Sequence, residues 1–158
     1  MVVAVPTEEA IAQWSAALEE KGVKYVRFEL PDLHGVSRLK VVPLAKATGY
    51  AKKGLNIYGG TLALDTASSV VGGSGYHEER KYQDHLLFPD LESTAPVPWM
   101  DNTVKVVCDA CWSSDDPLKG APRYVLKSLL DLAQQMGVNV MMGHVFEVYL
   151  LGGVTHRP

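Results

Sequence analysis

Apolar and polar positions follow two different periods along the chain, and the period distinguishes helices from strands. Apolar side chains recur every three or four residues over residues 7–20 and 122–136, which predicts two amphipathic helices. Thr7 stands at the N-cap position of the first helix, and Pro122 suits the first turn of the second. A shorter helix is predicted over residues 44–53.

Between the helices the pattern changes to alternation, which is typical of strands with one buried face. Residues 23–30 and 37–43 alternate on either side of a turn at 31–35 and predict an antiparallel hairpin. Residues 103–112 carry the most regular strand pattern, and a long strand is predicted over residues 138–151. Shorter extended pieces are expected within 55–65 and at 85–90 and 97–99, with a Ser/Gly-rich loop over 67–76.

The order of these elements predicts an α+β fold made of unequal parts. After an N-terminal helix within residues 1–20, a mixed sheet wrapped on a short helix accounts for residues 21–112. Residues 113–158 contribute a linker, one helix and one strand, which cannot close a hydrophobic core of their own. We therefore expect residues 113–158 to open a second, incomplete domain.

Composition is that of a globular protein and argues against several functional classes. The chain has 158 residues, of which 47% are hydrophobic and 21% charged, so disorder is not expected. A net charge of −3 argues against the broad basic surface of a nucleic-acid-binding protein. No apolar run approaches the roughly 20 residues that span a bilayer, and residues 1–14 lack the basic start of a signal peptide. We expect a cytoplasmic protein that binds neither nucleic acid nor membrane.

The two cysteines, Cys108 and Cys111, form a C-D-A-C sequence. Such a pair can be half of a zinc site or a redox couple. No second CxxC completes a zinc site, and a redox CxxC normally opens a helix. This pair lies instead in an alternating strand, where positions three apart point to opposite faces. Ordinary, partly buried strand cysteines are the favoured interpretation.

Two segments carry side chains that suit a functional site, each with a plain structural alternative. Asp65, with Ser68 and Ser69 nearby, can present a carboxylate and hydroxyl donors to a ligand, although a simple turn has the same composition. Glu147 is an acid in an otherwise apolar predicted strand, where burial is costly without a cation or donors. Glu147 is then a functional carboxylate that faces a metal or a cleft. The alternative is a structural carboxylate that faces solvent or pairs with an arginine.

Six segments share their order and spacing with one known family. They are VKYVRFELPDLHGVSRLKVVP at 23–43, LALDTASSVV at 62–71, DHLLFPDLESTAPVPW at 84–99, VVCDACW at 106–112, Pro122-Arg123 with Leu126, and GHVFEVYLL at 143–151. Together they resemble the glutamine synthetase family, especially its branch of glutamate–amine ligases. The resemblance runs from about residue 21 to residue 151.

This resemblance implies a fold and an activity. Residues 21–112 would be the family's N-terminal β-grasp domain, and residues 113–158 the truncated opening, a helix plus a strand, of its catalytic domain. The activity would be ATP-dependent formation of a γ-glutamyl amide from glutamate and ammonia or an amine, with Mg²⁺ or Mn²⁺ as cofactor. Subunits of the family form homo-oligomeric rings, in which the N-terminal domain of one subunit completes the active site of its neighbour.

The resemblance also implies roles for particular residues. Asp65 would be a catalytic carboxylate that attracts and helps to deprotonate the amine, with Ser68 and Ser69 as substrate-binding residues. Glu147 matches the second glutamate of the family's G-x-E-x-E strand, a metal ligand, whereas Val145 replaces the first. We expect the 158 residues alone to be inactive. The alternatives are a non-catalytic ring-assembly or regulatory member of the family, or a stand-alone β-grasp module that binds another protein.

Overall fold

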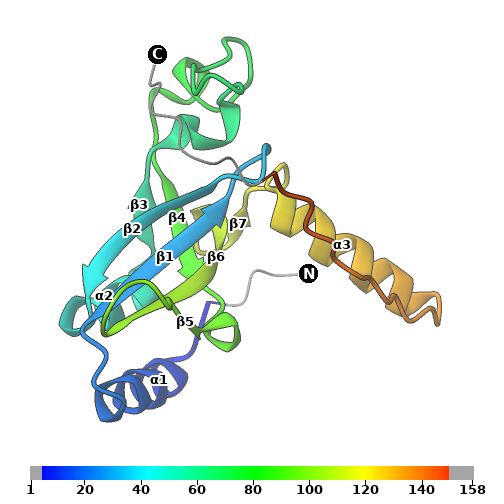
Figure 1. Cartoon of the computed structure of the whole chain (residues 1–158). Helices are drawn as coiled ribbons and strands as arrows, with labels where there is room; N and C mark the ends of the chain where they lie inside the picture. Colours follow the sequence, from blue (N-terminus) through cyan, green and yellow to red (C-terminus); the bar gives the residue numbers. More distant parts are fainter. Residues whose placement is uncertain (1–4, 150–158) are drawn as a thin grey trace.

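The computed structural model describes residues 5–149 and shows a mixed α/β fold around one curled sheet (Figure 1). The strands lie in the order β2-β1-β6-β4-β3, and β5 and β7 also pair with β6. The strands are β1 (Tyr25–Pro31), β2 (Ser37–Pro43), β3 (Leu55–Ile57), β4 (His85–Pro89), β5 (Ala95–Pro96), β6 (Thr103–Ser113) and β7 (Asp116–Pro117). The helices are α1 (Glu8–Glu20), α2 (Leu44–Lys53) and α3 (Pro122–Gln135), with 3₁₀ helices η1 (Gly59–Ala63), η2 (Glu78–Arg80) and η3 (Leu91–Ser93).

The longest strand, β6, joins two ladders into one sheet. Its residues 103–107 pair in parallel with β1, which is also the antiparallel partner of β2. Its residues 108–111 pair antiparallel with β4. The alternation at 103–112 therefore predicted the strand on which the whole sheet depends.

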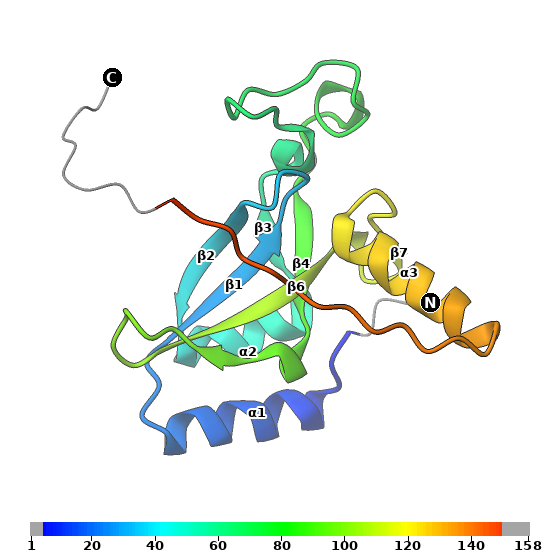
Figure 2. The same ribbon diagram turned by 45° about the vertical axis from the view of Figure 1, so that its right-hand side comes forward.

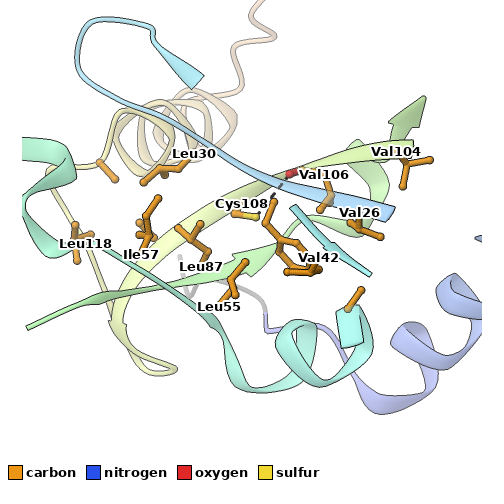
Figure 3. Packing of buried hydrophobic residues seen from close by; sticks show 14 of the residues in the cluster. Val26, Leu30, Val42, Leu55, Ile57, Leu87, Val104, Val106, Cys108 and Leu118 are labelled. Atoms are coloured by element: carbon orange, nitrogen blue, oxygen red, sulfur yellow. Dashed lines mark hydrogen bonds between the residues drawn. The ribbon is translucent and has the colours of Figure 1, made fainter. Parts of the chain in front are cut away.

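The hydrophobic core lies between the sheet and α2. Val26, Phe28 and Leu30 alternate along β1 and are completely buried, which confirms the period-two pattern. Val26 pairs with Val104 of the neighbouring strand β6, and Figure 3 shows Val26, Val104 and Val106 in the same part of the core. The core also takes in side chains of the helices, namely Leu18, Leu44 and Ala47.

The three helices lie where their periodicity and end signals predict them. The N-cap of α1 is formed by Thr7, whose Oγ1 accepts a hydrogen bond of 3.2 Å from the Ala10 amide. The last turn of α2 ends at Gly54, which has φ +82°, a left-handed conformation that favours glycine. Within residues 5–149 no helix has the length and apolar character needed to cross a bilayer.

The predicted long strand over residues 138–151 is wrong for residues 138–149, which form neither strand nor helix. Residues 150 and 151 lie outside the described part of the chain. After α3 the chain turns back, as Figure 2 shows, and every side chain from 138 to 149 is exposed. A strand needs a partner for its N–H and C=O groups, and none of the described strands pairs with this segment.

Two shorter predictions are wrong in part. Within residues 55–65 only β3 is a strand, and η1 follows where a second strand was expected. In η1 the backbone of Gly59 lies against the Gln83 carbonyl, which would be 1.9 Å from a Cβ atom at this position. Residues 97–99 form a turn rather than an extended piece, because the strand that pairs with β6 is the preceding β5.

Charged side chains attach α3 to the sheet, together with Tyr124, which is partly buried against the hydrophobic core. No residue of α3 is buried. Asp109 of β6 receives Arg123 Nε at 2.9 Å and Lys127 Nζ at 2.5 Å, one on each carboxylate oxygen. Asp90 also pairs with Arg123, and its Oδ2 lies 3.8 Å from Lys127 Nζ. Asp109 is 7% exposed and is therefore the central anchor of the helix.

We expect Asp109→Asn to lower the free energy of unfolding by about 1–2 kcal/mol, since breaking a buried ion pair is costly but partial exposure of the two cations screens the loss. Urea unfolding followed by circular dichroism measures the change. The matched control is Asp101→Asn, which removes the same charge from an exposed side chain. Equal stability of the two variants would show that the cluster does not anchor α3.

Candidate functional site

The loop that carries Asp65 is an ordered turn. An isolated bridge between Leu64 and Val70 closes it. Inside it, Asp65 Oδ1 accepts hydrogen bonds of 2.9 Å from both the Ala67 and the Ser69 amides. The Asp65 amide in turn donates to the Ser69 carbonyl at 2.8 Å. The segment can therefore be a turn and also present a carboxylate to a ligand, because the turn holds the carboxylate in one orientation.

Ser68 and Ser69 are both exposed beside this carboxylate. Ser68 has φ +63°, a left-handed conformation that costs a residue other than glycine about 1–2 kcal/mol. Its hydroxyl accepts a hydrogen bond of 3.3 Å from Arg38 Nη2. The structure thus brings together the three residues that the sequence singled out in this loop.

The turn between β1 and β2 lies against the Asp65 loop. His34 Nε2 donates to the Leu64 carbonyl at 2.9 Å. Arg38, which reaches Ser68, also donates from Nε to Asp32 Oδ2 at 2.8 Å. The other oxygen of Asp32 accepts the His34 and Val36 amides at 2.9 Å each. Two loops that are 30 residues apart in sequence are therefore tied to each other.

Asp32 is 3% exposed, yet it is held as a carboxylate. Burial raises the pKa of Asp32, but the hydrogen bond from Arg38 and the amides of His34 and Val36 outweigh it and leave this pKa below its ordinary value. A carboxylate satisfied in this way is a rigid support for the turn around it.

Sequence reasoning missed Asp32, His34 and Arg38 as members of the site. The sequence predicts a turn at 31–35 and a strand at 37–43, and these two elements contain the three residues. No local pattern connects that turn with the Asp65 loop. The contacts depend on how η1 brings the chain back beside the hairpin.

Glu147 is not part of this site in the structure. It lies in the exposed segment 138–149, as does Val145, which is 84% exposed. Within residues 5–149 no group of three His, Cys, Asp or Glu side chains is arranged to hold a metal ion. The described residues therefore do not by themselves form the metal site that the family resemblance implies, and the role of Glu147 stays a prediction.

The two cysteines are structural. Both are free thiols with 0% exposure, Cys108 in the main core and Cys111 in a smaller cluster with Phe88. Burial raises the pKa of the Cys108 thiol and raises that of Cys111 to about 12. Neither thiol is poised to ionise, which confirms ordinary strand cysteines, although both are completely rather than partly buried.

No protein-family model matches the chain. Individual proteins match it over most of its length. A glutamate–isopropylamine ligase from a Pseudomonas species is 32% identical over 139 residues, which cover 85% of this chain and 30% of that ligase. A glutamine synthetase from Rhizobium meliloti (strain 1021) is 31% identical over 137 residues, which cover 87% of this chain and 28% of that enzyme. The chain belongs to the glutamine synthetase family.

Two further relatives agree with this assignment. Human lengsin is 28% identical over 141 residues, covering 86% of this chain and 27% of lengsin. The solved structure of a GmaS/ADP complex superposes with a TM-score of 0.62 at 28% identity, covering 78% of this chain and 26% of that chain. The family that the ordered motifs indicated is thus confirmed. The chain spans less than a third of the length of these relatives.

Proposed function

We propose that this segment serves a glutamine-synthetase-type ligase, which uses ATP to form a γ-glutamyl amide from glutamate and ammonia or an organic amine. We also propose that the Asp65 loop contacts the amine. The observation that carries both proposals is the Asp65 carboxylate, which is held in one orientation on an ordered loop beside two exposed serines. A relative named as a glutamate–isopropylamine ligase supports an amine as the nitrogen donor.

The chemistry of the loop suits a cationic amine. Ammonium and alkylammonium ions are positively charged near neutral pH, and a carboxylate binds them through charge-assisted hydrogen bonds. Asp65 Oδ1 is engaged by the two loop amides. Oδ2 makes no hydrogen bond within the described residues, so it is the oxygen that would accept the ammonium protons. A carboxylate in contact with the amine can also act as the base that frees its lone pair for attack.

The exposed apolar surface of α3 supports the division of the chain into domains. The apolar stripe that predicted α3 is largely exposed, with Leu126 at 45%, Leu129 at 58% and Met136 at 71%. We propose that residues 21–112 form a β-grasp domain and that residues 113–158 open a catalytic domain, whose further chain covers this stripe. In that domain Glu147 would be one metal ligand, and the ATP and Mg²⁺ or Mn²⁺ sites would lie mainly outside these residues. The complete ligase would be a homo-oligomeric ring.

A chimera tests this function. In it, residues 5–121 replace the matching segment of the Pseudomonas glutamate–isopropylamine ligase. We expect the chimera to release phosphate from ATP in the presence of glutamate, amine and Mg²⁺. The 158-residue chain alone should release none above background. Turnover by the 158-residue chain would contradict the division, and a folded, oligomeric but inactive chimera would contradict the function.

A non-catalytic, ring-assembling member is the second candidate, and Val145 is the observation that favours it. A valine side chain offers no oxygen to a hard divalent cation. Restoring glutamate at this position in a full-length relative that carries this segment should raise Mg²⁺ affinity if the lineage was recently catalytic. Native mass spectrometry can detect mixed assembly of this chain with a full-length synthetase. Such assembly, with Mg²⁺ affinity unchanged by the restored glutamate, would favour the non-catalytic candidate.

A further inference from the structure

The Asp65 loop starts from the buried 3₁₀ helix η1, but the residues at its tip have little to hold them in place. Residues 66–69 are all exposed, and the loop begins a segment that projects beyond the sheet in both Figure 1 and Figure 2. Its internal hydrogen bonds shape the turn, but these exposed bonds alone neither keep the turn closed nor fix where it points relative to the sheet. That direction decides where the Asp65 carboxylate lies.

We infer that His34 and Arg38, in the β1–β2 turn and at the start of β2, are positioning residues that set the direction of the Asp65 carboxylate. His34 holds the carbonyl of Leu64, the residue immediately before Asp65. Arg38 holds the hydroxyl of Ser68, three residues after it. The carboxylate is therefore clamped on both sides from one element of the sheet. The importance of this clamp for activity rests on the proposed function, in which Asp65 contacts the amine.

Asp32 gives the clamp its rigidity. Its carboxylate is almost completely buried and takes three donors, two amides of the turn and Arg38 Nε. Arg38 thus has one nitrogen bonded to Asp32 and another bonded to the loop, and the rigid fork of the guanidinium holds these two donors in a fixed arrangement that a lysine ammonium lacks. The Asp32 charge also balances the Arg38 charge, so the clamp does not place a net positive charge near the site of a cationic amine.

Small displacements of such a carboxylate matter. Catalytic groups act well only within about 0.5 Å of the productive geometry, and a shift of about 1 Å lowers rates by roughly 100-fold. A clamp made of two hydrogen bonds from a rigid turn is a way to hold an exposed loop to that tolerance.

Amide hydrogen exchange of this chain, measured by NMR without substrate, tests the inference. The reporters are the amides of Ala67 and Ser69, which are protected only while the Asp65 turn is formed. We expect His34→Ala and Arg38→Lys each to speed their exchange about fivefold, because each variant loses a hydrogen bond worth about 1 kcal/mol. The amide of Val106, in the core of the sheet, should keep its rate.

A matched variant separates positioning from general destabilisation. His34→Gln keeps an N–H donor at a similar reach to Nε2, so the Ala67 and Ser69 amides should exchange as in the native chain. Three outcomes would overturn the inference: native exchange in both His34→Ala and Arg38→Lys, equal acceleration at Val106, or His34→Gln behaving like His34→Ala. None of these depends on catalysis, so failure of the clamp is distinguishable from failure of the proposed ligase function.

Discussion

Replacing Asp65 by asparagine in the active chimera is expected to lower kcat/KM for the amine about 100-fold or more. Removal of a general base typically costs 10²–10⁴ in rate, and the electrostatic attraction for the ammonium ion is lost with it. Asparagine keeps an oxygen that can accept the Ala67 and Ser69 amides, so the turn should be preserved. The substitution therefore removes the negative charge of Asp65 and preserves the turn around it.

Steady-state kinetics with the amine as the varied substrate measure this effect. The KM values for ATP and glutamate should stay close to those of the parent chimera, because the proposed contact is with the amine alone. Asp101→Asn is the control, since it removes an exposed carboxylate elsewhere on the same domain. If Asp65→Asn retained more than a third of the parent kcat/KM, the role of Asp65 would be disproved.

The second large effect is expected in the pH dependence of stability and comes from His85. This side chain is 0% exposed, lies edge-on to Trp112 at 4.6 Å and to Tyr76 at 5.9 Å, and neither ring nitrogen has a hydrogen-bond partner among the described residues. Burial lowers the pKa of His85 to about 4, although the nearby Asp84 carboxylate opposes the shift. The imidazole is therefore neutral in the folded protein.

The direction of the effect follows from the two protonation states. Between pH 6.5 and about pH 4 the unfolded chain binds a proton at His85 that the folded chain does not. Stability from this group is complete above pH 6.5 and falls as the pH is lowered. We expect a loss on the order of 2 kcal/mol between pH 7.5 and 4.5 from this residue.

Urea unfolding of the native chain and of His85→Phe at pH 7.5 and 4.5 isolates the contribution of His85 to the pH dependence of stability. Phenylalanine fills a similar volume and carries no titratable group, so the variant should lose less stability than the native chain on acidification. His144→Gln, at an exposed position, should behave like the native chain. Parallel pH profiles for the native chain and His85→Phe would refute the prediction.

Local patterns in the sequence determined most of the regular structure. Helical spacing, the Thr7 cap and the proline at position 122 defined α1 and α3, because these signals act within one helix. Alternation defined the β1–β2 hairpin and β6, because one face of each strand had to be buried. The order of motifs determined the family, and the Asp-Ser composition picked out the loop that the structure shows to be an ordered turn.

Only the tertiary structure decided what depends on neighbours. Residues 138–149 have the apolar pattern of a strand but no described partner, and a strand cannot be stabilised without one. No local pattern distinguishes His85 from the other histidines, and only the fold places it edge-on against the Tyr76 and Trp112 rings. The link from Arg38 to Ser68 spans 30 residues, so no periodicity could reveal it. The sequence encodes which residues become helix, strand and turn, whereas the contacts that orient the Asp65 carboxylate arise only when the β1–β2 turn and that loop pack together.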